Sequence, residues 1–260
     1  MNQTIETLMN RRSVRAYTDQ PLSSEERQTI LHAAMRAPTA GAMMLYSVIE
    51  VEDQAMKDKL AVSCDNQPFI AKAPYVLLFL ADYQRWMDYY KLCDVEALCA
   101  RENIRPRQPQ AGDLMLACCD ALIAAQTSVI AAEALGIGSC YIGDIMEQYE
   151  LHREMFDLPP YVFPITMVCF GYPTEQQKNR EQVPRFDQEF VIYKNKYRRL
   201  NDEEFARMYA VTEPRWNPAA YLKSAANPGQ HTYLRKFVAD FSLEMNRSAR
   251  AAMEQWLKGD

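Results

Sequence analysis

Two groups of basic residues are the places in this sequence where residue type and spacing could do chemistry. Arg11-Arg12-Ser13-Val14-Arg15 puts three guanidinium groups and a hydroxyl within five residues, and Lys178 with Arg180 forms a second group far along the chain. Arginine presents a planar fork of N–H donors that matches phosphate oxygens. We expect a phosphate pocket that draws cations from both groups. The alternatives are a helix end whose arginines complement its dipole, and a basic surface loop.

Other motifs in the chain exclude common kinds of site. Gly136-Ile137-Gly138 begins like a dinucleotide-binding fingerprint, but it lacks the third glycine and follows a helix where a strand is required. We therefore exclude a Rossmann fold and expect these glycines to end the helix. There is no Gly-x-Ser-x-Gly elbow and no P-loop. The three histidines are far apart and no Cys-x-x-Cys occurs, so no metal site is expected.

Composition indicates an ordinary soluble protein. The 260 residues include 29 Lys and Arg against 34 Asp and Glu, which gives a net charge of −5. This charge predicts no binding to nucleic acid or to an acidic membrane surface. The N-terminus has neither a basic start nor an apolar run, and the seven cysteines show no disulfide-like spacing. We expect reduced thiols and a cytoplasmic protein.

Hydrophobic periodicity and end signals predict helices and strands in alternation. Helices are expected at 4–10, from Ser23 to before Pro38, at 53–62, within 83–101 and at 113–135; the second starts with the capping box Ser23-x-x-Glu26. Strands are expected at 46–52, 75–81, 141–142, 164–170 and, at an edge, 190–193. After residue 200 the pattern predicts a polar helix, a connector containing Pro214, Pro218 and Pro228, and a last helix at about 234–257.

The helix expected at 113–135 is apolar around most of its circumference. Asp120, Gln126 and Glu133 interrupt the apolar run, so it indicates a buried helix rather than a membrane span. A helix with so small a polar face must be enclosed. The cover could come from its own domain or from a partner subunit.

Five motifs in order resemble the nitroreductase family of FMN-dependent oxidoreductases, over roughly residues 4–199. They are Arg-Arg-Ser-x-Arg, Ala37-Pro38-Thr39-Ala40-Gly41, Asn66-Gln67, Tyr141-Ile142-Gly143, and Gly171-Tyr172-Pro173 leading to Lys178-x-Arg180. The resemblance implies an α+β fold, with an antiparallel-dominated sheet flanked by helices and two chains intertwined as a homodimer. It implies an FMN-binding core at 1–199 and a C-terminal helical extension at 200–260, packed on the core or on the partner.

The resemblance also implies which residues contact the cofactor. Two FMN molecules would lie in clefts between the chains, each touching both. The implied contacts are Arg11, Arg12, Ser13, Arg15, Pro38, Thr39, Gln67, Ile142, Gly143, Lys178 and Arg180. Among these, Arg15, Lys178 and Arg180 would hold the phosphate, Gln67 would hydrogen-bond the polar edge of the ring, and the backbone of Gly143 would lie near flavin N5. No catalytic side chain is implied.

The sequence departs from the family pattern in one of these motifs. Where family members commonly carry a polar Asn and Gln, this chain has Ala42 and Met44. Their flavin contacts are therefore lost or replaced by backbone groups. The identity of the electron acceptor stays open for this reason.

By resemblance, the activity is hydride transfer from NADH or NADPH through flavin N5 to a nitroaromatic, quinone or similar planar acceptor, by a ping-pong mechanism. Tyr83, Trp86, Tyr89 and Tyr90 could form a substrate lid or could simply pack their helix. Alternatives are reductive dehalogenation or flavin fragmentation in the same pocket, and a flavin sensor without turnover. The preference between NADH and NADPH is not readable from the residues.

Overall fold

The computed structural model describes residues 2–210 and 217–259. The chain divides into two compact units, one formed by Met1–Arg180 with Glu244–Asp260 and the other by Glu181–Leu243. The division therefore falls at residue 180 where the sequence suggested 199, and most of the C-terminal helix belongs to the first unit. Pro214 of the expected connector lies outside the described residues.

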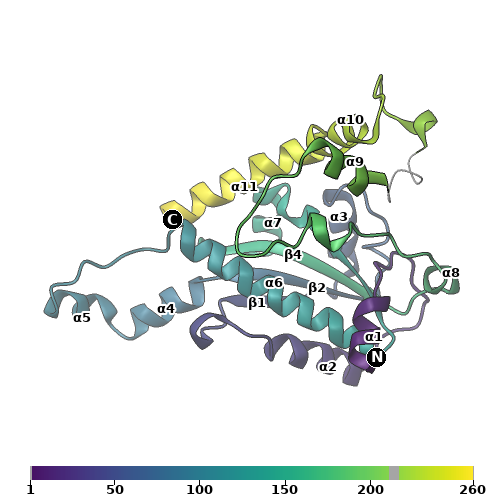
Figure 1. The fold of residues 1–260 in the computed structure, drawn as a ribbon. Helices are drawn as coiled ribbons and strands as arrows, with labels where there is room; N and C mark the ends of the chain where they lie inside the picture. The colour runs from purple at the N-terminus through teal and green to yellow at the C-terminus, as the bar shows by residue number, and fades with distance from the viewer. Residues whose placement is uncertain (1, 211–216, 260) are drawn as a thin grey trace. The chain divides into compact units, whose positions relative to one another are not determined.

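The first unit carries the sheet and most of the helices (Figure 1). Its helices are α1 Gln3–Asn10, α2 Ser24–Met35, α3 Gln54–Ser63, α4 Gln84–Leu92, α5 Val95–Arg101, α6 Ala111–Ala134, α7 Tyr149–Met155 and α8 Glu175–Lys178, with most of α11 Asp240–Lys258. Its strands are β1 Tyr46–Glu50, β2 Tyr75–Asp82, β3 Gly138–Ile142 and β4 Val162–Gly171. Most of these elements match the predicted series, but the short helices α7 and α8 were not predicted, and the region 83–101 is divided into α4 and α5.

The second unit holds short helical segments. They are the 3₁₀ turn Gln188–Phe190, α9 Asp202–Ala210, the 3₁₀ turn Pro218–Ala220, α10 Pro228–Thr232 and the π turn Tyr233–Phe237. The edge strand predicted at 190–193 was wrong. The backbone N–H groups of Val191 and Ile192 both donate to the Gln188 carbonyl, at 3.1 and 2.8 Å, so a local turn uses the groups that a strand would have paired.

The sheet has the strand order β1-β2-β4-β3, and every pairing is antiparallel. All residues of β2 are buried, as expected for a central strand covered on both faces. On one face, Leu77 and Phe79 pack against α2 and α6. On the other, Val76 and Leu78 pack against Leu60 of α3. The antiparallel α+β fold confirms the predicted fold class.

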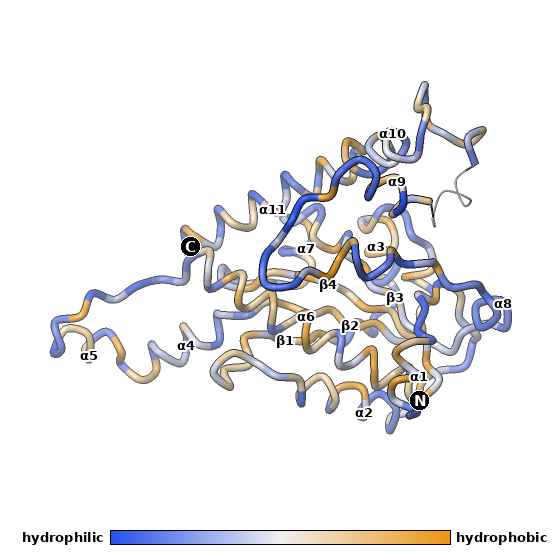
Figure 2. Tube along the Cα trace, viewed as in Figure 1, coloured by the Kyte–Doolittle hydropathy of each residue, from blue (hydrophilic) through white to orange (hydrophobic). Residues whose placement is uncertain are grey.

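Helix α6 lies along the sheet and supplies small side chains to the core, including Ala121, Ala124 and Ala125. Figure 2 shows hydrophobic residues running along both α6 and the strands. The helix ends where Gly136 adopts φ +75° and Ile137 N–H donates to the Ala132 carbonyl at 2.9 Å, a Schellman cap. Among the described residues α6 is the one helix long and apolar enough to cross a membrane, by length and composition only.

The arginine-rich segment after α1 is joined to the sheet by backbone hydrogen bonds. Val14 N–H donates to the Ser139 carbonyl at 2.9 Å, and Thr18 N–H donates to the Tyr172 carbonyl at 2.8 Å. The approach is possible because position 138 is glycine: a Cβ there would lie 2.5 Å from Val14 Cγ2. The missing side chain of Gly138 thus lets the segment lie directly against β3.

A buried carboxylate on α6 fixes the loop that leads into β1. Asp120 is 3% exposed and accepts hydrogen bonds from the Thr39 hydroxyl and from the backbone N–H groups of Ala40 and Leu45, both at 3.1 Å. The residue that interrupts the apolar pattern of α6 is therefore the anchor for this loop. Buried backbone donors without a partner are costly, so Asp120 stabilises the loop conformation.

Helix α11 packs on the core in the first unit. Tyr149 N–H donates to Ser248 Oγ at 3.0 Å, and Arg247 forms an ion pair with Glu150 at 2.7 Å. Trp256 is 1% exposed, with its ring 5.7 Å from that of Tyr161.

Replacing Asp120 tests the loop anchor. Asp120→Asn keeps the side-chain shape but substitutes a donor for one acceptor oxygen. We expect a loss of about 3 kcal/mol in the free energy of unfolding, because buried donors lose their partner. Asp88→Asn, at an exposed helical position, should change it by less than about 0.5 kcal/mol. Urea unfolding measures both, and equal midpoints for the two variants would contradict the assigned role.

Replacing Gly138 tests the close approach of the arginine-rich segment. We expect Gly138→Ala to destabilise the protein by about 1–3 kcal/mol through overpacking against Val14. In a double-mutant cycle, adding Val14→Ala should cost less in the Gly138→Ala background than in the wild type, because it removes the clashing methyl groups. Strictly additive losses in thermal unfolding would show that the two residues do not press on each other.

Candidate functional site

The two basic groups of the sequence lie side by side in the structure. Arg12 Nη1 donates to the carbonyl oxygens of Lys178 and Arg180 at 2.7 and 2.5 Å, and the backbone N–H of Arg15 donates to Gln177 Oε1 at 3.2 Å. The first segment follows α1 and the second follows β4 through α8, so residues more than 160 positions apart meet here. Arg12 acts as the link between the segments.

The remaining cations of this cluster differ in how they are paired. Lys178 Nζ lies 2.6 Å from Glu175 Oε1, an exposed pair. Among residues 2–210 and 217–259, no carboxylate forms an ion pair with Arg15 or Arg180. Arg15 instead places its guanidinium 5.9 Å from the centre of the Phe69 ring. Neither guanidinium group therefore has a carboxylate partner among the described residues, although Arg15 also lies within hydrogen-bond reach of the Cys140 side chain, and both could contact an anion.

A carboxyl group that sequence reasoning did not assign lies beside this cluster. Burial raises the pKa of Glu133, at the end of α6, to about 7, and the nearby guanidinium groups of Arg11 and Arg12 oppose that rise. Its Oε1 is buried without a hydrogen-bond partner among the described residues. Because Glu133 is neutral below its pKa, the cluster carries more net positive charge at low pH.

Gln67 has a fixed orientation near β3. Its Nε2 donates to the Cys64 carbonyl and to Asp144 Oδ2, each at 2.9 Å. Both amide protons are thereby used, and no donor among the described residues reaches its Oε1. Gln67 therefore offers an acceptor oxygen to a ligand.

Asp144 has a second acidic neighbour that the sequence did not reveal. Glu147 is 4% exposed; burial raises its pKa to about 7, and repulsion from Asp144 adds to the effect. Both residues border the 3₁₀ turn Asp144–Met146. The signal in the sequence was only two acids three residues apart, which is common on protein surfaces.

Gly143 lies at the end of β3 with room beside it. Its φ and ψ of −79° and −22° are open to any residue, and no atom lies within 4 Å of where a Cβ would be. The chain itself therefore does not require glycine here, and the space suits close approach of a ligand to the backbone. Ile142 is 1% exposed, so its side chain belongs to the core and only its backbone could face a ligand.

Pro38 and Thr39 lie elsewhere in the same chain. Thr39 is bound to Asp120, whereas the basic cluster lies by Glu133, thirteen residues further along α6. With a rise of 1.5 Å per residue these points on the helix are about 20 Å apart. One chain therefore holds the two groups of predicted contacts at well-separated points along α6.

The loop containing Ala42 and Met44 is held in an unusual backbone conformation. Both residues have positive φ, 57° and 50°. Asparagine tolerates this region better than alanine does, so the departure from the family pattern at position 42 also costs local stability. Met44 is nevertheless fixed by a 2.8 Å hydrogen bond from its N–H to Thr39 Oγ1.

The aromatic residues of α4 pack on one another and on this loop. The Trp86 ring lies 5.9 Å from Tyr89 and 5.6 Å from Tyr90, and Trp86 Nε1 donates to the Met43 carbonyl at 2.8 Å. Tyr89 is half exposed. These aromatic residues therefore pack their helix, and the exposed part of Tyr89 could still contact a planar molecule.

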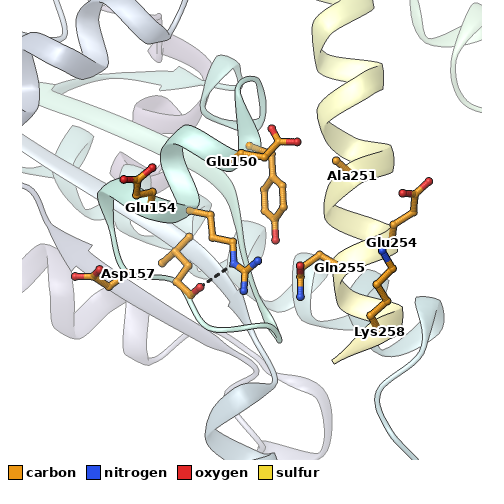
Figure 3. A pocket seen from close by; sticks show the side chains of 10 residues that line it. Glu150, Glu154, Asp157, Ala251, Glu254, Gln255 and Lys258 are labelled. Carbon is orange, nitrogen blue, oxygen red and sulfur yellow. Dashed lines mark hydrogen bonds between the residues drawn. The ribbon is translucent and has the colours of Figure 1, made fainter. Parts of the chain in front are cut away.

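A cavity of about 460 Å³ between α7 and α11 is unrelated to the predicted contacts. Figure 3 shows Glu150, Glu154 and Asp157 on its α7 side and Glu254 and Lys258 on α11. None of the predicted cofactor residues lines it. Its wall carries four carboxylates against two cations, Arg153 and Lys258, which disfavours a phosphate.

Comparison with known proteins identifies the family. The family model described as "Nitroreductase family" matches residues 8–172, more than half of the chain. The chain is 34% identical over 205 residues to the Bacillus subtilis protein named FMN reductase (NADPH), covering 79% of this chain and 78% of the relative. It is 30% identical over 207 residues to the oxygen-insensitive NADPH nitroreductase of Salmonella typhimurium, covering 80% of each.

Solved structures of other proteins match this fold. The structure of NfrA2 from B. megaterium matches with a TM-score of 0.80 and 27% identity, covering 98% of both chains. Nitroreductase A from Vibrio parahaemolyticus matches with a TM-score of 0.79 and 25% identity, covering 97% of this chain and 98% of the other. The fold and the ordered motifs lead to the same conclusion: this chain belongs to the nitroreductase family.

Proposed function

We propose that this protein is an FMN-dependent oxidoreductase that takes hydride from NADPH or NADH and delivers it to a nitroaromatic, quinone or similar planar acceptor. The main support is the Arg12 link, which holds two cationic segments together at 2.7 and 2.5 Å. The relatives named FMN reductase (NADPH) and NADPH nitroreductase support the same chemistry.

The residues present fit FMN. Arg15 and Arg180, which form no ion pair with a carboxylate among the described residues, offer guanidinium groups for its phosphate, and Gly143 leaves open space beside the backbone. Gln67 presents an acceptor oxygen, which suits the imide N–H on the pyrimidine edge of a flavin. Bound FMN would supply the redox chemistry, accepting hydride from the nicotinamide and returning it to an acceptor.

The protein's own part is to bind and to orient. Arg12 donates hydrogen bonds to the Lys178 and Arg180 backbone carbonyls and so fixes the 178–180 segment. These bonds use neither the Arg15 nor the Arg180 guanidinium group, so both side chains remain able to contact the phosphate. Asp144 and the Cys64 carbonyl fix the Gln67 amide so that its oxygen, not its nitrogen, faces a ligand. No side chain is required to move a proton at the reacting atom in this proposal. Ping-pong turnover follows if donor and acceptor use one site in turn.

The working form we propose is a cytoplasmic homodimer. Met115, Leu116, Leu122 and Ile123 of α6 are 40 to 67% exposed, and Ile5, Leu8 and Met9 of α1 are 38 to 65% exposed. An apolar surface of this kind is suited to burial against a second copy. The partner would also supply its own Pro38 and Thr39 region, which one chain holds about 20 Å along α6 from its basic cluster. All seven cysteines are free, in keeping with a reducing compartment.

Removing the two unpaired guanidinium groups tests the phosphate assignment. We expect Arg15→Ala and Arg180→Ala to fold and to bind FMN about 10- to 100-fold more weakly each, the loss of one charge-assisted hydrogen bond or more. Arg101→Ala, an exposed arginine on α5, should bind FMN like the wild type. Fluorescence titration of the apoprotein with FMN gives the affinities, and full FMN retention in both site variants would refute the assignment.

Anaerobic mixing of the wild-type holoprotein separates enzyme from sensor. Loss of the flavin absorbance on adding NADPH or NADH is expected, with recovery on adding a quinone. Flavin that stays oxidised with both nucleotides would favour a flavin-binding sensor.

A further inference from the structure

A second cavity, of about 840 Å³, opens between the arginine-rich segment, α3 and the 68–74 loop. Cationic side chains at its wall are Arg15, Lys57 and Lys72, and Asp19 is the sole carboxylate among the described residues that line it. Apart from Arg15, none of the predicted flavin contacts lies at this wall. The cavity therefore has a positive lining of its own.

Lys57 is the residue that distinguishes this cavity from an ordinary basic surface. It is 8% exposed, whereas most lysines keep their ammonium group in water. Its Nζ donates to the Ala73 carbonyl at 3.2 Å, and no described residue forms an ion pair with it. An ammonium group has three donors, so two remain for a group in the cavity.

A buried charge without a counter-charge is unfavourable and calls for a partner. Lys72, exposed at the rim, and Arg15 add positive charge on the same wall, while Thr18 and Gln54 add polar groups. A tetrahedral dianion could accept from several of these donors at once. The volume is larger than a bare phosphate ion needs and leaves room for an attached group.

We propose that this cavity is a second anion site, distinct from the flavin phosphate site, that binds a phosphate group through Lys57. The phosphate could be inorganic or could belong to a nucleotide such as the 2′-phosphorylated half of NADPH. The proposal does not depend on the proposed activity, since Lys57 is outside the flavin contacts. Arg15 is the one predicted flavin contact that also lines this cavity.

The test uses the FMN-loaded protein, so that the flavin phosphate site is already filled. Binding of inorganic phosphate and of 2′,5′-ADP is measured by calorimetry at constant ionic strength. We expect Lys57→Met to weaken binding of the better ligand at least tenfold. Lys59→Met, an exposed lysine on the same helix, should stay within twofold of the wild type. Tighter binding of 2′,5′-ADP than of phosphate would identify the nucleotide as the source, and the reverse would identify the free ion.

Stability and flavin content separate this role from others. In phosphate-free buffer, Lys57→Met should be at least as stable as the wild type, because it removes an uncompensated buried charge, and should retain its FMN. The proposal is overturned if neither anion binds, if Lys57→Met and Lys59→Met bind alike, or if Lys57→Met melts well below the wild type, which would make the Ala73 contact structural. Loss of FMN from Arg180→Ala remains a separate result that bears only on the flavin site.

Discussion

The hydrogen bonds from one guanidinium group, that of Arg12, to two backbone carbonyls help to fix the relative position of the two cationic segments at which we propose that the FMN phosphate binds. They bring the segment after α1 to the segment after α8, at 2.7 Å from the Lys178 carbonyl and 2.5 Å from that of Arg180. They act together with the hydrogen bonds from Arg15 N–H to Gln177 Oε1 and from Thr174 N–H to the Ala16 carbonyl, which join the same two stretches of this chain of net charge −5. Gly138 also helps to position the arginine-rich segment, because its missing side chain lets Val14 lie against β3.

Helix α6 sets a second constraint, the distance between the Thr39 loop and the basic cluster. Asp120 near its middle holds the Thr39 loop, and Glu133 near its end lies beside Arg11 and Arg12. The two points are about 20 Å apart along the helix, so one chain holds the contacts implied by the family pattern in two separate places. A second copy placed against the exposed apolar side of α6 would resolve this, and it would give the helix the cover that its composition demands.

Much of the fold could be predicted because its signals are local. The capping box at Ser23 and Glu26, the apolar run of β2 and the helix stop at Gly136 each act through neighbouring residues. The edge strand expected at 190–193 failed for a related reason: its apolar residues suit a strand, but the Gln188 carbonyl competes for the backbone donors. The local sequence pattern does not show whether these backbone N–H groups will bond to a neighbouring strand or to a nearby carbonyl.

The cationic residues of the candidate site could be proposed from the sequence, but its acidic residues could not. Arginine clusters stand out in an acidic sequence, whereas the roles of Asp120, Asp144 and Glu147 depend on residues far away in the chain, such as Thr39 and Gln67. Lys57 likewise looks like any helical surface lysine until the fold buries it. The pattern of residue types along the sequence does not show which side chains become buried or which distant residues they contact.

The claim that the convergent cations recognise a phosphate is tested most directly by comparing FMN with riboflavin, which lacks only that group. Equilibrium titration of the wild-type apoprotein should give FMN an affinity at least about 100-fold higher than riboflavin, as expected for two or more charge-assisted hydrogen bonds. Equal affinity for the two flavins would mean that Arg15 and Arg180 do not hold the phosphate.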